Sequence, residues 1–461
     1  MRAGTTAGVT TESWPWRRAL AWLAFLAPFF FITYGLANWS AAQRVDVPTI
    51  RFDWETSIPF WPWTILPYWS IDLLYGLSLF VCLTRSELDT HAKRLLTAQV
   101  VAVTCFVFMP LRFSPAHPAA DGVWGFMFDV LAGFDQPFNQ LPSLHIALTV
   151  ILWALYARRL TGATRVAMGV WFLLIGGSVL TTYQHHFIDV PTGLLLGALC
   201  LWTWPFADEG NGLSIASQWQ WTRERKRWWL AAGYVAGATA VATIAIVASG
   251  WWLWLLWCSV SFVLVAAAYA AIGAPAFQKR DNGRLNGGAR WLFAPYRALA
   301  WINSRLWTWR EPHPMAVADG VFLGRMPTSR ELVLSPFVGV IDMTAELAIR
   351  FDRDCTHLAI PVLDLTTPPP AALAQAAGAI DAMRAHGPVL VCCALGYSRS
   401  ACAVAAWLLA SGRAADVDAA LAIVRRARAK VSFDHRHTAA LNGIVEARAR
   451  QHTTIATSGA Q

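Results

Sequence analysis

Near the C-terminus a cysteine, Cys393, is followed six positions later by an arginine, Arg399. This spacing suits a thiolate nucleophile at the bottom of a phosphate-binding loop. We expect residues 387–391 to form a buried strand and residues 401–409 to form a helix. The loop between them would then lie at a helix N-terminus. Backbone N–H groups there bind anions, and the same positive end stabilises the thiolate, which is the reactive form of cysteine.

The expected loop contains groups with different tasks. Arg399 can hold two phosphate oxygens in a bidentate fork, and Ser400 can donate a hydrogen bond to the sulfur as it leaves phosphorus. The alternative interpretation is a buried cysteine at a strand end beside an exposed arginine. The backbone amides expected to line the anion site belong to Ala394, Leu395, Gly396, Tyr397 and Ser398.

This loop resembles the His-Cys-x5-Arg-Ser/Thr signature of the dual-specificity and tyrosine phosphatase family. The resemblance extends over about residues 314–445, where segments 319–325 and 340–344 look like two strands of the family's domain. It implies hydrolysis of phosphomonoesters through a phosphocysteine intermediate. Cys392 stands where the family has histidine, and its thiol could react with an oxidised Cys393.

The resemblance also implies a general acid, an aspartate about thirty residues before the cysteine. Asp364 matches that position. An acid is needed because an alkoxide leaving group must be protonated as the P–O bond breaks. Asp342 competes for the role, but its place within an apolar strand favours a structural one.

Two histidines and an aspartate form a second set of residues suited to phosphoryl chemistry. His145 opens one apolar segment, and His185 and Asp189 lie between two later ones. A neutral imidazole can attack phosphorus, a carboxylate four residues on can fix its tautomer, and a second histidine can protonate the leaving oxygen. Interfacial histidines without chemistry are the alternative.

The residues around these positions resemble the motifs of the type 2 phosphatidic acid phosphatase superfamily. Segment 142–145 reads Pro-Ser-Leu-His where the second motif has Pro-Ser-Gly-His, and 185–189 matches the third. The resemblance implies that His185 is the nucleophile, Asp189 its orienting carboxylate and His145 the leaving-group acid.

Two departures from these motifs concern phosphate binding. Ser178-Val179 replaces the Ser-Arg of the third motif, so one expected arginine is absent, and Arg112 is the best candidate for the weak first motif. The leucine in the second motif is closer to the branch that contains inositolphosphoceramide and sphingomyelin synthases. Those enzymes transfer a phospho-head group.

The composition indicates a membrane protein, because 56% of residues are hydrophobic, 14% are charged and 26 are tryptophan. We expect an all-α multi-span membrane domain followed by an α/β cysteine-phosphatase domain in which helices flank a central sheet. Runs long enough to cross a bilayer predict about eight spans, at 19–38, 59–83, 95–111, 143–157, 166–183, 190–206, 228–248 and 250–274.

Basic residues set the expected orientation, because Arg and Lys gather before the first span and in every second connection. By the positive-inside rule these segments face the cytoplasm. This places Cys393 in the cytoplasm and His185 on the opposite face. The net charge of +9 then reflects orientation and contact with anionic lipid, and no nucleic-acid partner is expected. The eight cysteines form no disulfide framework, and we expect neither a metal nor a cofactor.

The sequence thus predicts a membrane domain at 1–275 with its motif core at about 95–207, and a phosphatase domain at 314–450. Between them, 276–313 is expected to lie in the headgroup layer or to be a plain linker, and 451–461 to be a disordered tail. One hypothesis is phospholipid metabolism in the inner (cell) membrane, with phosphorylated lipids or their head groups as substrates. A second is signalling through phosphoproteins, with the membrane half an anchor or sensor. A third is that the membrane half binds lipid without catalysis.

Overall fold

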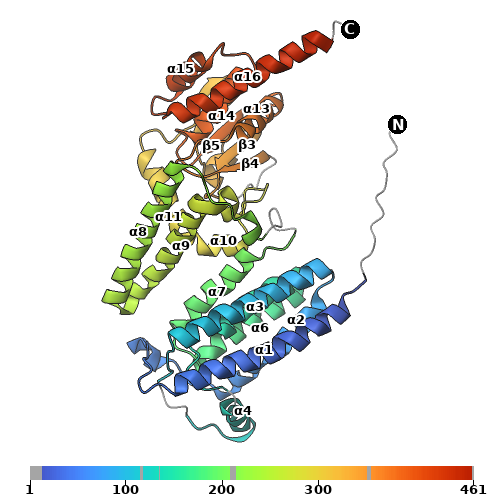
Figure 1. The fold of residues 1–461 in the computed structure, drawn as a ribbon, viewed down its shortest axis with the longest axis vertical. Helices are drawn as coiled ribbons and strands as arrows, with labels where there is room; N and C mark the ends of the chain where they lie inside the picture. The colour runs from blue at the N-terminus through green and yellow to red at the C-terminus, as the bar shows by residue number, and fades with distance from the viewer. Residues whose placement is uncertain (1–12, 115–117, 134, 208–213, 350–354, 459–461) are drawn as a thin grey trace. The chain divides into compact units, whose positions relative to one another are not determined.

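The computed structural model describes residues 13–114, 118–133, 135–207, 214–349 and 355–458, and the chain divides into two compact units. The first unit comprises Met1–Asp208 with Gly212–Ser214, and the second comprises Glu209–Asn211 with Ile215–Gln461 (Figure 1). This division falls before the boundary expected at 275. The last two apolar helices belong to the second unit and pack with other elements of that unit.

The described part of the first unit is helical. Buried side chains of α3 and α5, mainly leucine and alanine, form the largest part of its core. Ser143 caps α5 by accepting a hydrogen bond from the Ile146 amide, at 3.3 Å. The helices are α1 (Trp16–Ala42), α2 (Ile65–Val81), α3 (Arg85–Phe108), α4 (Gly122–Ala132), α5 (Leu144–Arg159), α6 (Gly162–Thr181) and α7 (Asp189–Thr203), with short 3-10 turns at Asp53–Ser57 and Pro62–Thr64.

Two glycines let α7 lie close against α5. A Cβ atom at Gly193 would lie 2.5 Å from the Ser143 carbonyl oxygen, and one at Gly197 would lie 2.7 Å from Cβ of Val150. Glycines four residues apart on one helix face allow such close backbone approach. This contact fixes the start of α7 beside the start of α5.

Five helical segments in the described residues are long and apolar enough to cross a membrane. They are Trp16–Ala42, Pro62–Val81, Gly162–Thr181, Arg225–Ala248 and Gly250–Ile272. The other three expected spans fall on α3, α5 and α7. Helix α3 begins with a charged turn, and α5 and α7 are 16 and 15 residues long.

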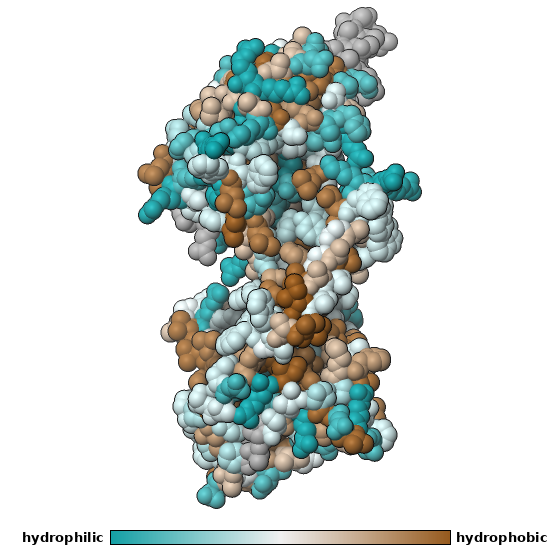
Figure 2. All heavy atoms as spheres, turned by 90° about the vertical axis from the view of Figure 1, so that its left-hand side faces the viewer, coloured by the Kyte–Doolittle hydropathy of each residue, from teal (hydrophilic) through white to brown (hydrophobic). Residues whose placement is uncertain are grey.

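The second unit opens with a helical hairpin. Helix α8 (Arg225–Ala248) is joined by a 3-10 turn (Gly250–Trp254) to α9 (Leu255–Ala267), which continues as a π-helical turn at Ala268–Ile272. The two helices lie side by side in Figure 1, and Ser259 Oγ donates to the Ala238 carbonyl at 2.9 Å. In Figure 2 brown, hydrophobic residues gather in the region of this hairpin, whereas the C-terminal domain above it is mainly teal and white with smaller brown patches.

Segment 276–313 belongs to the second unit and is partly helical. It contains α10 (Gly287–Leu292) and α11 (Ala294–Trp307), preceded by a 3-10 turn at Ala274–Phe277. The rings of Phe277 and Phe293 are buried and lie 4.6 Å apart. The aromatic residues of this segment therefore divide between an internal core and an exposed face.

A five-stranded sheet forms the centre of the C-terminal domain, in the order β1-β2-β5-β3-β4. Strand β5 pairs in parallel with β2 and β3, β4 pairs in parallel with β3, and β1 is antiparallel to β2. The central strand is therefore the one that leads into the cysteine loop. The strands are β1 (Met315–Ala318), β2 (Val321–Arg325), β3 (Gly339–Thr344), β4 (Thr356–Val362) and β5 (Val389–Cys393).

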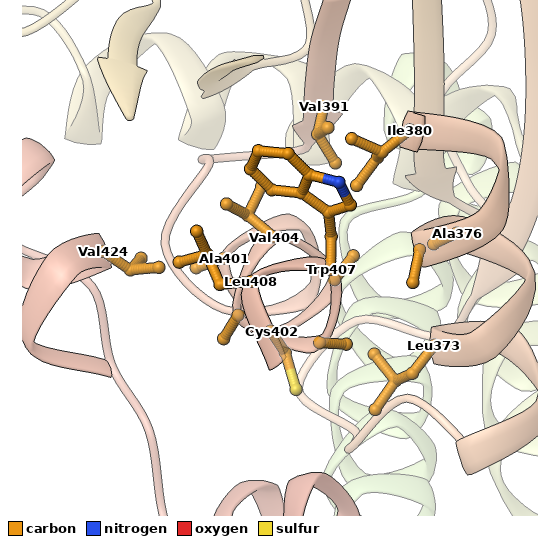
Figure 3. Packing of buried hydrophobic residues seen from close by; sticks show 14 of the residues in the cluster. Leu373, Ala376, Ile380, Val391, Ala401, Cys402, Val404, Trp407, Leu408 and Val424 are labelled. Carbon is orange, nitrogen blue, oxygen red and sulfur yellow. The ribbon is translucent and has the colours of Figure 1, made fainter. Parts of the chain in front are cut away.

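Helices cover both faces of this sheet, as expected. On one face, Trp407 of α14 is fully buried among side chains of α13, β5 and α15 (Figure 3). On the other, residues of α12 and the partly buried Ala300 of α11 pack against the sheet. Helix α16 continues to Ser458, through most of the segment expected to be disordered. The helices are α12 (Ser329–Val333), α13 (Pro370–Arg384), α14 (Arg399–Ala410), α15 (Val417–Ala427) and α16 (His435–Ser458).

Candidate active sites

The cysteine loop connects the carboxyl end of β5 with the N-terminus of α14. Cys393 is the last residue of the strand and Arg399 the first residue of the helix, which confirms the predicted strand and helix. Ligands of open parallel sheets bind at the carboxyl ends of the strands. The loop occupies this position.

Two backbone carbonyl groups of the loop accept hydrogen bonds from side chains outside the loop. The Ser304 hydroxyl donates to the Ala394 carbonyl, and Arg428 donates to the Leu395 carbonyl at 3.1 Å. Since N–H and C=O point in opposite directions across a peptide, these contacts turn the next amides toward the loop interior. The Gly396 amide accordingly donates to Cys393 Sγ at 3.2 Å.

Gly396 is required by the loop's conformation. Its φ of +77° lies in the left-handed region, and a Cβ atom there would lie 2.5 Å from the carbonyl of Gly324. A side chain at this position would push the loop away from β2.

The two adjacent cysteines face opposite sides of the sheet, because successive side chains alternate along a strand. Cys393 Sγ accepts a second hydrogen bond, from Ser400 Oγ at 3.1 Å. Cys392 packs in the cluster on the other face, and burial raises the pKa of its thiol well above the usual value. Cys392 is thus a neutral, buried thiol that points away from Cys393.

Arg399 is held in place by a buried glutamate. Its two terminal nitrogens bind both carboxylate oxygens of Glu346, at 2.8 and 2.9 Å. Nη1 also donates to the Val362 carbonyl at 2.8 Å, and Nη2 lies 2.9 Å from Asp364 Oδ1. Burial alone would lower the pKa of Arg399, but the charges of Glu346 and Asp364 raise it well above its usual value.

Asp364 lies on the loop that follows β4, within hydrogen-bonding distance of the arginine that would hold phosphate. The next residue, Leu365, has a φ of +56°, which is unfavourable for a branched side chain. From the helical hairpin, the Tyr269 hydroxyl donates to the Asp364 backbone carbonyl at 2.9 Å. The loop is therefore tied to the end of α9.

Asp342 has a structural role, as expected. It is fully buried, and its carboxylate receives hydrogen bonds from Lys279 Nζ and from the Thr344 amide. Burial would raise the pKa of Asp342, but the charge of Lys279 lowers it below the usual value. Asp342 therefore serves as the buried partner of Lys279 within the sheet.

A three-residue hydrogen-bond chain ends at the loop. Ser398 Oγ lies 3.0 Å from His437 Nε2, and His437 Nδ1 lies 2.7 Å from Asp434 Oδ1. His437 lies in the first turn of α16 and is buried, and Asp434 directly precedes the helix. The chain holds the last residue of the loop before Arg399.

The first unit brings together the three residues of the second constellation. His185 Nδ1 lies 3.3 Å from Asp189 Oδ2, and His185 Nε2 lies 3.1 Å from Ser143 Oγ. If Nδ1 carries the proton toward Asp189, Nε2 is left with its lone pair. His145 and His185 line the same cavity, and the His145 ring stacks on Tyr68 with centroids 4.2 Å apart.

Arg112 is not brought to this cavity. Its side chain is exposed and is not part of the lining. The neighbouring His186 instead has its own partners, with Nδ1 2.8 Å from Glu55 Oε2 and Nε2 accepting from the Ser114 amide at 3.3 Å. Of the predicted residues in this unit, two histidines and one aspartate thus converge and the arginine does not.

The family model described as dual specificity phosphatase, catalytic domain, matches residues 321–445. Tk-PTP in its active form is similar to the chain, with 28% identity over 30% of this chain and 98% of that one and a TM-score of 0.28. Human DUSP28 shows 25% identity, coverage of 30% and 99%, and a TM-score of 0.27. PTPMT1 in complex with PI(5)P shows 21% identity, coverage of 30% and 98%, and a TM-score of 0.28. No curated protein matches the chain.

Residues 321–445 therefore form a dual specificity phosphatase catalytic domain, and the protein is a phosphatase. The loop that begins at Cys393 lies within this domain. Sequence reasoning missed Glu346, Ser304, Arg428, Tyr269 and His437, which hold the loop, Arg399 and Asp364 in place.

The contact between Tyr269 and the Asp364 loop leads to a testable expectation. Tyr269→Phe removes one hydrogen bond of about 1 kcal/mol, so we expect turnover of an alkyl phosphate to fall by about 3- to 10-fold. Hydrolysis of an aryl phosphate with a good leaving group should change less, because that group needs little protonation. Steady-state kinetics of the two substrates would measure the difference.

Tyr234→Phe is the matched control, because the Tyr234 ring stacks on Tyr269 at 5.6 Å from the same aromatic cluster. It should leave the ratio of the two rates unchanged. An equal loss on both substrates with Tyr269→Phe would mean that the tyrosine supports the fold and not the acid.

Proposed function

We propose that the C-terminal domain hydrolyses phosphate monoesters of membrane lipids or their head groups at the cytoplasmic surface of the inner (cell) membrane. Cys393 Sγ attacks phosphorus, the bond from phosphorus to the ester oxygen breaks, and Asp364 gives its proton to that oxygen. Water then attacks the phosphocysteine, with Asp364 now accepting a proton, and releases inorganic phosphate and the thiolate. Arg399 and the loop amides hold the phosphate oxygens throughout.

The observation that carries this proposal is the apolar helix beside the active site. Helix α11 donates to the loop through Ser304, and its Trp307 carbonyl accepts from the Tyr397 hydroxyl at 3.3 Å. Other side chains on and just after this helix are large, hydrophobic and exposed, which suits a helix lying in the headgroup layer. They are Leu299, Trp301, Ile302, Leu306 and Trp309.

The hairpin that contacts the Asp364 loop has the features of a membrane-spanning element. Exposed tryptophans lie at both of its ends, Trp228 and Trp229 at the start of α8 and Trp251 and Trp252 at the tip. Helix α8 has 24 residues, which corresponds to about 36 Å and exceeds the hydrocarbon thickness of a bilayer. Tryptophans at both ends suit the two membrane interfaces. Tyr269, at the same end as Trp228, would then hold the active site at the level of the lipid head groups.

The test compares a phosphorylated lipid in vesicles with a soluble phosphopeptide, using the purified full-length protein. We expect faster hydrolysis of the lipid. Leu306→Asp on the exposed face of α11 should lower lipid hydrolysis by about 10-fold while leaving a soluble aryl phosphate unchanged. Val333→Asp, at an apolar and exposed position on α12, serves as the control. Preference for the phosphopeptide, unaffected by Leu306→Asp, would favour the signalling hypothesis.

The orientation has its own expected result. In intact cells an impermeant thiol reagent should label a cysteine introduced at Ala119 and should miss one introduced at Asn282, both exposed positions. Permeabilised cells should show labelling at both. The reverse pattern in intact cells would contradict the cytoplasmic location of the phosphatase domain.

We propose phosphoryl or phospho-head-group chemistry as a second activity, at the histidines of the first unit. Its support is the alignment of Ser143, His185 and Asp189 together with a cavity that also contains His145. His185 Nε2 would attack phosphorus, and His145 would protonate the leaving oxygen. In a Cys393→Ser background, lipid turnover abolished by His185→Ala would support this activity. Turnover that persists would remove His185 from the mechanism, and turnover of no lipid would favour a lipid-binding anchor.

A further inference from the structure

A cavity of about 410 Å³ lies inside the first unit, and its wall is mainly apolar. Its aromatic lining comes from α1 and α2, and its polar lining includes two carboxylates as well as the two histidines. The carboxylates belong to Asp72 of α2 and Asp135, which precedes α5.

The charges in this cavity are unusual for a phosphate site. No lysine or arginine is among its lining residues, and among the described side chains no basic group forms an ion pair with Asp72 or Asp135. A dianionic phosphate monoester would find no lysine or arginine there to neutralise its charge. A carboxylate in apolar surroundings must take up a proton or bind a cation.

Aromatic rings surround the carboxylates. Tyr34 donates to Asp135 Oδ1 at 2.7 Å, and the rings of Tyr68 and Tyr75 line the cavity on the helix that carries Asp72. Tyrosine faces attract ammonium groups through the negative potential of the ring, most strongly where water is excluded. Aromatic rings and carboxylates together form the chemistry that selects an organic cation.

The shape of the cavity suits an elongated molecule. Its lining follows one face of α1 over eleven positions, from Leu23 to Tyr34, which corresponds to about 16 Å at 1.5 Å per residue. The polar residues gather near Tyr34, and the other lining residues of α1 are apolar. They are Leu23, Ala27, Phe30 and Phe31.

We propose that this cavity binds an amphiphile whose head group carries an ammonium group, with Asp72 and Asp135 facing the cation and the apolar wall facing the chain. The site selects zwitterionic or cationic lipids against lipids that end in a phosphate monoester. The proposal gives the class of lipid substrate for the chemistry proposed at His185, and any reaction rests on that proposed function. Binding of the amphiphile can be measured without turnover.

Binding can be measured with three dodecyl amphiphiles that differ only in the head group: dodecyltrimethylammonium, dodecylphosphocholine and dodecyl phosphate. The full-length Cys393→Ser protein in nanodiscs would be titrated with each probe below its micelle concentration. We expect the two ammonium probes to bind at least about 10-fold more tightly than dodecyl phosphate. Asp72→Asn should reduce that preference by about 10-fold, because the amide keeps the size of the carboxylate and removes its charge.

Two further variants separate the possible failures. Asp129→Asn removes an exposed carboxylate of the same unit that is outside the cavity, and it should leave the preference unchanged. Asp135→Asn should reduce the preference in the same way, so one cavity variant can replace the other if that one fails to fold. Thermal unfolding without a probe would show whether each variant is folded. Tighter binding of dodecyl phosphate, or a preference insensitive to both cavity variants, would overturn the proposal.

The binding preference for ammonium probes is tested independently of whether His185→Ala abolishes turnover. If the preference for ammonium probes persists in that variant, the site binds such lipids whether or not it reacts with them. If turnover is found on a phosphate monoester lipid while the ammonium preference is absent, the second activity stands and the ligand class is wrong.

Discussion

Replacing Cys393 with serine should abolish hydrolysis of phosphate monoesters by the C-terminal domain, while the chain remains folded. A serine hydroxyl is similar in size and can still accept from Gly396 and Ser400, but it does not ionise at neutral pH and is a far weaker nucleophile. The loss should be the same on alkyl and aryl phosphates, since both need the attack on phosphorus. Single-turnover assays with the purified protein would measure it.

Asp364→Asn should give a different pattern, and the comparison identifies the acid. Hydrolysis of an alkyl phosphate should fall by about 10²- to 10⁴-fold, because the amide cannot protonate the leaving oxygen. An aryl phosphate with a good leaving group should lose much less. Asp418→Asn, at an exposed position of α15, is the control and should change neither rate. Equal losses on both substrates would reject Asp364 as the acid.

The cysteine loop could be predicted because its determinants are local. A buried apolar strand, a run of loop residues and the first turn of a helix lie within about twenty consecutive positions, and the anion site is formed by their backbone amides. Asp364 could be assigned only through the family resemblance. The structure adds that its carboxylate lies 2.9 Å from Arg399, close to where phosphate would bind.

The residues that hold the loop in place could not be predicted, because they are distant in the sequence. Glu346 lies 53 positions before Arg399, and Ser304 lies 90 positions before Ala394. No periodicity or spacing indicates such partners. Burying an ionised glutamate costs free energy unless a cation pairs with it, so a buried glutamate implies a partner. Whether Glu346 is buried is known only from the folded structure.

The first unit shows the same limit. The motifs that single out His145, His185 and Asp189 are short segments at the starts of α5 and α7, and two glycines bring those helices together. The acidic character of the cavity was missed. Asp72 lies inside an apolar helix and matches no motif, so only the lining reveals that it faces the same space as the histidines.

Segment 276–313 was expected to lie between two domains, yet it supplies the counter-charge for a residue at the centre of the sheet. Lys279 Nζ is fully buried and donates to Asp342 Oδ2, to the Thr344 carbonyl at 2.8 Å and to the Thr344 hydroxyl at 2.9 Å. Breaking a buried ion pair by removing one partner leaves an uncompensated charge, which typically costs about 3–5 kcal/mol. The phosphatase domain should therefore depend on residues outside the 321–445 match.

Lys279→Met is expected to lower the thermal midpoint of phosphatase activity by about 10 °C or more in the full-length protein, since each kcal/mol shifts the midpoint of a domain of this size by several degrees. Arg284→Met, an exposed basic residue of the same segment, should shift it little. Adding Asp342→Asn to Lys279→Met should recover part of the loss, because the neutral amide can still accept from the Thr344 amide without leaving a buried charge. A protein that begins at residue 314 should be unstable for the same reason and should be rescued by the same substitution. If that truncated protein were as stable as the full-length one, the ion pair would contribute nothing to the fold.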